Sequence, residues 1–423
     1  MGAERAAVRA VMTAGACLVL ALTACAGQAG NARLSEAEAS GDGTLRIGLI
    51  LDNVGDRSFL NDSQRTAARL AVQEINAAGG HKGKPVELLP EKVNEDASGQ
   101  ARELVAAKAD VVIGPTDSSN AGEAIDVLAR AKVTLISPAN TAMALSKYKS
   151  GGYYFRTAAA DVAQASVLAK LAKDGGARSV AVIHEAGSYG ADVLGAVKSA
   201  ASQADLDIAV DAEFTPGDAR GAAAKAKDSA PDAVILVARQ DAVGAIAELN
   251  NAGLGGKKLI LSDGAVDQYG SRLGSKALDG SRGVLPGTFP SAHFQGELVA
   301  VNAQLKDMTF AAETYDAANL AAIAAAAAQD DAGASIASHL LAVSGGRTAS
   351  EADRAADAQV CKTYQECAEA IRLGKTVDYD GESGAIAFDS SGDITSANYM
   401  VFTYGADNTA KMSGTESAAK DAG

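Results

Sequence analysis

Two clusters of small polar residues offer the clearest chemistry in this chain. They are VVIGPTDSSN (residues 111–120) and VTLISPANT (residues 133–141). In each, an apolar β-branched run stops abruptly in hydroxyl and amide residues, and a helical pattern follows. If both runs are neighbouring strands of a parallel sheet, their ends share the edge where open α/β sheets bind ligands. The side chains that would surround this spot are those of Ser118, Ser119, Asn120 and Thr141.

Such a spot suits an anion. Helix N-termini carry unpaired N–H donors and a partial positive charge, and the hydroxyl groups add further donors. A ligand carboxylate is therefore the first candidate. The alternative is that these Ser and Asn residues only cap the helices that follow them.

The N-terminus predicts export and lipid attachment. Arg5 and Arg9 precede an apolar stretch over residues 10–22, which is typical of a signal peptide and too short for a membrane span. The stretch ends in Leu-Thr-Ala-Cys25, which resembles a bacterial lipobox, so Cys25 would carry the lipid. The alternative is an ordinary signal peptide with an incidental cysteine. Residues 26–43 lack periodicity and predict a flexible linker after Cys25.

Composition limits the other possibilities. A chain of 423 residues exceeds what one hydrophobic core usually organises, so two domains are expected. The net charge of −14, without a basic cluster, argues against nucleic acid and against anionic lipid as partners beyond the lipid anchor itself.

The cysteines and histidines indicate a disulfide and no metal site. Cys17 leaves with the signal peptide, and Cys361 and Cys367 remain, six positions apart. Outside the cytoplasm a disulfide between them is expected. The four histidines are scattered without metal-ligand spacing, so no metal is expected.

Signals for catalysis are weak. GLGGKK (residues 253–258) hints at a phosphate-binding loop, but it lacks the following Ser or Thr and precedes a strand instead of following one. The chain has no G-x-S-x-G elbow. We therefore expect neither an enzyme nor a cofactor.

Strands and helices alternate along the chain. Helical segments such as residues 63–80 separate the candidate strands, which predicts βαβ units and a parallel sheet. The series restarts after FRTAAAD (residues 155–161), interpreted as a crossing between two similar lobes. Residues 309–329 predict a long Ala-rich helix. The candidate strands cover residues 45–51, 86–90, 111–114, 133–137, 179–184, 208–214, 233–237 and 259–263.

Several motifs in order resemble one family over about residues 45–411. EINAAGGHKGKPVEL (residues 74–88) contains the family's Asn, Gly-Gly and Gly spacing, and VIGPTDSSN and ISPANT are similar to its ligand loops. GSYGADV (residues 187–193) and the block over residues 361–394, with its cysteine pair, continue the match. The chain thus resembles the type I periplasmic binding proteins of the branched-chain amino acid and amide group, lipoprotein receptors of ABC importers.

The resemblance implies two similar lobes, each a parallel-sheet α/β sandwich, joined by three hinge crossings. A signal peptide (1–24) and a lipid-anchored linker (25–43) would precede them. The remaining boundaries would be 44–157 plus 286–393 for lobe 1, 158–285 plus 394–412 for lobe 2, and 413–423 for a disordered tail.

The resemblance also implies a ligand site between the lobes. Ser118 and Thr141 would hold a carboxylate, Tyr189 would close over the ligand, and Asp263 would face its α-ammonium, since a buried cation needs an acidic partner. The alternatives are that Asp263 caps a helix and that Tyr189 only packs. The full set of expected ligand-binding residues is Phe59, Ser118, Ser119, Ala139, Asn140, Thr141, Tyr189 and Asp263.

One segment departs from the family pattern. The chain has Ala-Arg239-Gln-Asp over residues 238–241, where several relatives place an aromatic residue. A charged group there does not suit an aliphatic ligand, so a polar amino acid, urea, a short amide or a peptide remain candidates. We expect a monomer at the extracytoplasmic membrane face that serves an ABC permease. A sensor that signals to a separate membrane protein is the alternative.

Overall fold

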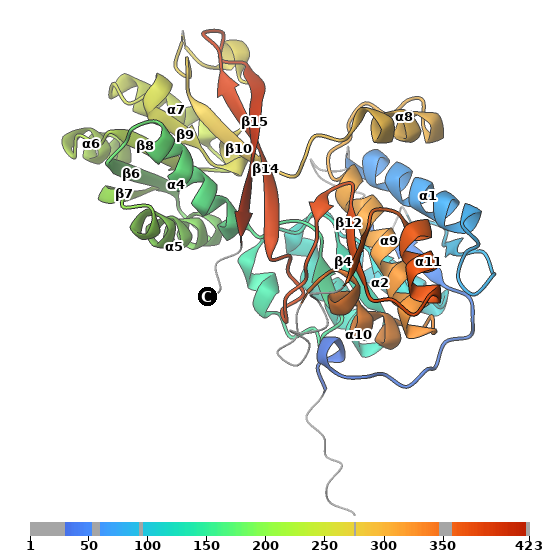
Figure 1. Ribbon diagram of the computed structural model, residues 1–423. Coiled ribbons are helices and arrows are strands. Elements are labelled where there is room, and N and C mark those ends of the chain that lie inside the picture. The colour runs from blue at the N-terminus through green and yellow to red at the C-terminus, as the bar shows by residue number, and fades with distance from the viewer. Residues whose placement is uncertain (1–29, 53–59, 93–95, 275, 347–357, 420–423) are drawn as a thin grey trace, which may run out of the picture.

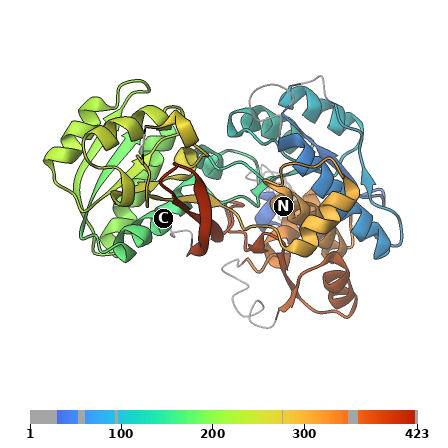
Figure 2. The same cartoon turned by 90° about the horizontal axis from the view of Figure 1, so that it is seen from above.

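The computed structural model describes residues 30–52, 60–92, 96–274, 276–346 and 358–419. These residues form two α/β lobes that lie side by side (Figures 1 and 2). The predicted fold class, two α/β lobes, is confirmed; the sheet of lobe 1 is parallel as predicted, whereas antiparallel strands make the sheet of lobe 2 mixed.

Lobe 1 is built on a five-stranded parallel sheet in the order β2-β1-β3-β4-β5. Apolar residues of α2 (Ala97–Ala106) and α3 (Ala121–Arg130) cover one face. The other face packs against α1 (Asn61–Ala77), α9 (Ala311–Ala328) and α10 (Gly333–Val343). The strands are β1 (Arg46–Leu49), β2 (Glu87–Leu88), β3 (Val111–Ile113), β4 (Thr134–Ser137) and β5 (Tyr154–Arg156).

Lobe 2 is built on a seven-stranded mixed sheet in the order β15-β14-β10-β9-β8-β6-β7. Neighbours from β7 to β10 run parallel, whereas β14 is antiparallel to both β10 and β15. One face packs against α4 and α5, the other against α6 and α7. The strands are β6 (Ser179–Glu185), β7 (Asp207–Phe214), β8 (Ala233–Val237), β9 (Leu259–Leu261), β10 (Arg282–Pro286), β14 (Ser396–Tyr404) and β15 (Ala410–Ala419), and the helices are α4 (Gln164–Asp174), α5 (Ser188–Gln203), α6 (Arg220–Asp228) and α7 (Ala242–Asn251).

The Ala-rich segment forms the central helix of lobe 1. Every residue of α9 from Ala311 to Ala325 is buried, because the sheet, α1, α10 and α11 (Tyr364–Arg372) surround it. Alanine permits such close approach on all sides and is the best helix former. Helix α8 (Ala292–Val301) extends outward beside α1 (Figure 1).

A small third sheet completes lobe 1. It contains β11 (Gln359–Cys361), β12 (Val377–Gly381) and β13 (Gly384–Ala385). The expected disulfide is present: Cys361 at the end of β11 pairs with Cys367 in α11, with Cα atoms 5.4 Å apart. It fastens this helix to the sheet edge.

Two predictions about the chain ends are wrong for the described residues. The tail predicted as disordered (413–423) continues β15 as far as Ala419, where backbone pairing with β14 holds a polar segment. The linker predicted as flexible (25–43) is fixed on lobe 1 from residue 30 onward. There Asp330 accepts N–H bonds from Ser40 (3.1 Å) and Gly41 (3.0 Å), and Asp331 accepts one from Gly43 (2.9 Å).

In the described part of the chain, no helix combines the length and apolar character that a bilayer crossing requires.

Candidate functional site

The first ligand loop begins at Gly114, directly after β3. Its φ of +117° is left-handed, and a Cβ there would lie 2.1 Å from the Ile50 carbonyl oxygen, so this turn requires glycine. The loop is then held by Asp52, at the end of β1. This carboxylate accepts the Asp117 N–H (2.7 Å) and the Asn120 side-chain amide (3.1 Å). Asp52 is not among the residues expected from the sequence, although it too follows an apolar strand.

Three of the expected ligand residues are used within the loops instead. Ser119 donates its N–H and O–H to Asp117 Oδ1 (2.9 and 2.8 Å). The fully buried Asn140 donates to the Pro115 and Thr116 carbonyls (3.0 and 3.1 Å), and Ala139 N–H donates to Ser137 Oγ (3.3 Å). These bonds shape the two loops, and contact of these three residues with a ligand stays a prediction.

Ser118 and Thr141 come together as expected, but with different chemistry. Ser118 Oγ accepts the N–H groups of Thr141 (3.2 Å) and Ala142 (3.4 Å), so these donors are not free for an anion. Among the described residues the hydroxyl proton of Ser118 has no acceptor, and the two hydrogen bonds that its oxygen accepts make it a better donor. Both residues are half-buried, so this proton can face a ligand.

Arg156 fixes this loop to the hinge. It is fully buried at the end of β5 and forms a two-pronged ion pair with Asp393, with Nε–Oδ1 2.7 Å and Nη2–Oδ2 2.9 Å. Its Nη1 donates to the carbonyls of Asn140 (3.3 Å) and Ala142 (3.0 Å). The loop that carries Thr141 is therefore tied to the chain segment that returns to lobe 2.

Lobe 2 brings Tyr189 and Asp263 into direct contact. The Tyr189 hydroxyl, in the first turn of α5, bonds to Asp263 and lies 2.9 Å from Ser262 Oγ. Gln164 at the start of α4 donates to Asp263 Oδ1 (2.7 Å) and accepts its backbone N–H (3.0 Å). The Asp263 carboxylate thus faces side chains, which the helix-cap alternative does not explain.

Arg239 completes this cluster from the loop after β8. Its guanidinium carbon lies 3.8 Å from the centre of the Tyr189 ring. Its Nη2 lies 3.1 Å from Asp161 Oδ1 and 3.6 Å from Asp263 Oδ2. From the sequence, Arg239 is recognised only as a departure from the family pattern, although it follows a strand as Ser118 and Thr141 do. Asp161, within FRTAAAD, gave no comparable signal.

A buried glutamate holds the Arg239 loop. Glu185, the last residue of β6, accepts the N–H groups of Arg239 (2.8 Å), Gln240 (2.9 Å) and Asp241 (3.3 Å). Three backbone dipoles stabilise its charge, so it serves the loop and not a ligand. The charged side chains that remain in this cluster are Asp161, Asp263 and Arg239, whose formal charges sum to one negative charge.

Burial and mutual charge shift the titration of this cluster. Burial raises the pKa of Asp161, the charge of Asp263 raises it further, and Arg239 opposes both. Burial disfavours the charged form of Arg239, but Asp161 and Asp263 outweigh it and raise the pKa of the guanidinium. Burial and Asp263 hold the pKa of Tyr189 well above its ordinary value, so its hydroxyl stays protonated and able to donate.

The two halves of the site meet at Asp161. Its N–H donates to the Thr141 carbonyl (2.8 Å), and its carboxylate bonds to Arg239. A continuous set of contacts therefore runs from Ser118 in lobe 1 through Thr141 and Asp161 to Arg239 in lobe 2. The Ser118 hydroxyl lies in lobe 1 and the carboxylates of Asp161 and Asp263 lie in lobe 2, but both are close to the first crossing between the lobes.

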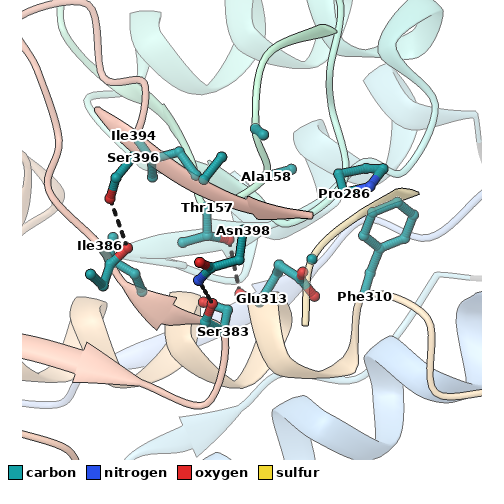
Figure 3. Close-up of a pocket in the computed structure, with 14 residues that line it drawn as sticks. Thr157, Ala158, Pro286, Phe310, Glu313, Ser383, Ile386, Ile394, Ser396 and Asn398 are labelled. Atoms are coloured by element: carbon teal, nitrogen blue, oxygen red, sulfur yellow. Dashed lines mark hydrogen bonds between the residues drawn. The ribbon is translucent and has the colours of Figure 1, made fainter. Parts of the chain in front are cut away.

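A separate hollow lies in the hinge itself. It measures about 380 Å³, including space open to solvent, and none of the expected ligand residues line it. Figure 3 shows Glu313, at the start of α9, in this hollow beside Pro286 and Asn398, while Thr157 donates to the Glu313 carbonyl (2.9 Å). The three chain segments that cross between the lobes all contribute residues to its lining, so this hollow marks the hinge.

Two expected residues cannot be placed. Phe59 and Cys25 lie outside the described residues. Among the described residues, no group of three His, Cys, Asp or Glu side chains could hold a metal ion.

Similarity to known proteins agrees with this architecture. The model of the family described as periplasmic binding protein matches residues 44–363. A Leu/Ile/Val-binding protein of Rhizobium johnstonii is 33% identical over 178 residues, 41% of this chain and 48% of the relative. A leucine-, isoleucine-, valine-, threonine- and alanine-binding protein of Pseudomonas aeruginosa is 29% identical over 184 residues, 41% of this chain and 48% of that protein. The chain thus spans about half the length of the curated relatives it matches.

Solved structures share the fold over most of the chain. A branched-chain amino acid transporter substrate-binding protein of Streptococcus pneumoniae, in complex with isoleucine, has a TM-score of 0.62 at 21% identity, covering 89% of this chain and 100% of that one. An ABC transporter solute-binding protein of Rhodopseudomonas palustris, in complex with p-hydroxybenzoic acid, has a TM-score of 0.62 at 16% identity, covering 90% and 98%.

Proposed function

The chain belongs to the periplasmic binding protein family, and from this premise we propose that it captures an amino acid, or a related small zwitterion or amide, between its lobes and delivers it to an ABC permease. The relatives that it matches are binding proteins for leucine, isoleucine, valine and, in one case, threonine and alanine. Those relatives are solute-binding proteins and not enzymes.

The observation that carries the proposal is the charge arrangement around Asp161. Lobe 1 offers the Ser118 hydroxyl proton, a donor for a carboxylate, and lobe 2 offers a cluster with one net negative charge, which suits a cation. The carboxylate and ammonium of an α-amino acid are attached to one carbon, so their partners must lie close together. The hydrogen bond between Asp161 and Thr141 keeps the two halves adjacent.

The mechanism follows from the position of these groups on separate lobes. A ligand that contacts both lobes at once binds the closed form more tightly than the open form and shifts the population toward closure. The Ser118 hydroxyl would receive the carboxylate first, while the Thr141 N–H holds Ser118 in place. Asp263 and Tyr189 would then enclose the ammonium.

Location follows from the same proposal. The receptor would act on the extracytoplasmic face, held at the membrane by a lipid on Cys25. Further along the chain, Ser40 and Gly43 are fixed on lobe 1 by Asp330 and Asp331. An anchor at Cys25 would therefore hold lobe 1, while lobe 2 remains free to close and to present the loaded receptor to a permease.

The test is a ligand screen on residues 26–423. Thermal shift against the twenty amino acids, urea, short amides and dipeptides would find ligands, because a ligand that binds only the folded state raises the melting temperature. Calorimetry on the wild type and Asp263→Asn would follow. We expect an amino acid ligand to lose about 100-fold in affinity in the variant, since a buried ammonium would lose its carboxylate.

The matched control is Asp267→Asn, which removes a carboxylate that is 57% exposed in its pair with Arg272. This variant should bind like the wild type. Equal affinity of Asp263→Asn and the wild type would overturn the ammonium role of Asp263. If no amino acid, amide or peptide raised the melting temperature, the proposed function would be wrong.

A further inference from the structure

Arg239 is held from one side only. Its guanidinium stacks on Tyr189, and its Nη2 meets both carboxylates of the cluster, Asp161 and Asp263. A guanidinium has five N–H donors. Among the described residues, the Nε and Nη1 groups of Arg239 have no acceptor in hydrogen-bond range, and its side chain is 34% exposed. Part of the planar guanidinium group is thus fixed in place, and its remaining N–H donors are unused.

From this geometry we infer that Arg239 recognises an oxygen acceptor on the ligand's side chain, and that the preferred ligand is an amino acid with a side-chain amide, such as glutamine or asparagine. The inference rests on the proposed function and specifies its substrate class. It assigns to Arg239 the role of a specificity residue that touches the ligand.

An aliphatic ligand fits this site poorly. Closure over leucine would remove the free N–H groups of Arg239 from water without giving them an acceptor, and a buried donor left unpaired carries its full desolvation cost. A ligand oxygen would remove that cost. A site that is built to hydrogen-bond one group discriminates strongly against ligands that lack it.

A role as simple counter-ion does not account for the arrangement. Neutralising Asp161 and Asp263 needs only a positive charge, which a lysine ammonium would also supply. A planar fork stacked on an aromatic ring has a fixed orientation, and this pre-organisation favours directional hydrogen bonds to a ligand. The loop backbone that carries Arg239 is held as well, by Glu185.

Charge balance favours an amide over a carboxylate. The cluster of Asp161, Asp263 and Arg239 carries one net negative charge. The ligand ammonium neutralises it, which leaves the α-carboxylate to the Ser118 hydroxyl. A second carboxylate on the ligand would enclose one more negative charge, which Arg239 does not neutralise because its charge is already balanced by Asp161 and Asp263, and this is unfavourable at low dielectric. Glutamate and aspartate should therefore bind more weakly than glutamine and asparagine.

Calorimetry with glutamine, asparagine, glutamate and leucine tests the inference. For the wild type we expect at least about tenfold tighter binding of an amide ligand than of leucine or glutamate. In Arg239→Met, which keeps an unbranched stem but has no donors, the amide ligand should lose about 30-fold or more. Leucine binding should stay equal or improve, so the preference inverts. Arg239→Lys should retain only part of the preference, because it keeps the charge but not the fork.

The control is Gln240→Met at the neighbouring exposed position. Gln240 contacts Glu185 through its backbone N–H, which the substitution retains. It should leave both affinities unchanged. Tighter binding of leucine than of glutamine and asparagine by the wild type would overturn the inference and leave the proposed function standing. An equal loss for every ligand in Arg239→Met would reduce Arg239 to a counter-ion. If Arg239→Met does not fold, the preference of the wild type for amide ligands over leucine and glutamate tests the inference by itself. If the wild type binds no amino acid, both proposals are overturned.

Discussion

At the scale of single residues, the polar side chains of the site divide into two groups. Asn140 and Ser119 donate their hydrogen bonds within the loops, whereas Ser118 and Arg239 keep donors that no described residue accepts. All four follow strands in the sequence. Residue type alone does not separate them, because the separation depends on which way the loop turns each side chain.

Glu313 in the hinge hollow gives a pH-dependent prediction. Burial raises the pKa of this carboxyl to about 7; its own backbone N–H opposes the shift and the charge of Asp316 adds to it. Between the ordinary value of 4.5 and about 7, the unfolded chain releases a proton that the folded chain retains. The contribution of Glu313 to stability is therefore fully present below pH 4.5 and is lost as the pH rises through 7.

Glu313→Gln should remove this loss. At pH 5 the variant and the wild type should differ little in free energy of unfolding. At pH 7.5 the variant should be more stable by about 1–3 kcal/mol. Urea unfolding at both pH values measures the difference. The exposed Glu38→Gln controls for removal of one negative charge from the chain. An unchanged difference between the two pH values would contradict the assignment.

At the scale of elements, the alternating pattern predicted the parallel strands of both lobes well. The strand expected at residues 233–237 is β8 with the same bounds, and Ser118 and Thr141 lie at strand ends as expected. The signal was reliable because both faces of these strands are covered by helices. Such strands need continuous apolar runs that periodicity makes visible.

The hairpin of β14 and β15 had no such signal. Most of β15 is exposed, and its residues are small and polar. An edge strand of this kind is held by backbone hydrogen bonds to its neighbour, which any sequence without proline can form. The composition of residues 413–419 therefore predicted a tail, and only the presence of β14 beside it produces a strand.

Gly190 couples α5 to the site. A Cβ at this position would lie 1.8 Å from the Glu185 carbonyl oxygen, so glycine lets the start of α5 approach the end of β6. The added methyl group in Gly190→Ala should move Tyr189 away from the loop that carries Arg239, because Glu185 holds this loop. We expect a loss of about 1–3 kcal/mol in stability and weaker ligand binding, measured by urea unfolding and calorimetry.

Gly195→Ala in the same helix is the matched control. Nothing lies within 4 Å of its added Cβ, and the position is exposed. Alanine should therefore stabilise α5 by about 0.5–1 kcal/mol and leave binding unchanged. If both variants behaved alike, the close approach at Gly190 would not limit the packing of α5.

At the scale of the whole molecule, the N-terminal segment belongs to lobe 1. Besides the bonds to Asp330 and Asp331, Arg33 inserts beneath the hinge, where it donates to the carbonyls of Tyr154 and Ser390. The lobe that carries Ser118 is thereby fixed relative to the start of the described chain. In the described part of the chain, the backbone passes between the lobes at the three crossings, which is the arrangement that hinge closure requires.

Lipid attachment is tested by growing bacteria that produce the full chain with labelled fatty acid. Wild type should incorporate the label, and Cys25→Ser should not, because serine has no thiol to form the thioether. Cys17→Ser is the control and should retain the label, since this residue lies in the predicted signal peptide. Label in Cys25→Ser, or its loss in Cys17→Ser, would contradict attachment at Cys25.

The sequence by itself determined the class of fold, the polar loops that follow β3 and β4, and the disulfide, because these depend on short-range patterns of hydrophobicity and on local turn chemistry. The tertiary structure alone decided the electrostatics of the site. Asp161, Arg239 and Asp263 lie far apart in the chain and become one cluster only when the first crossing, β8 and β9 end at the same edge. Charge interactions depend on distance in space, and distance in sequence does not reveal it.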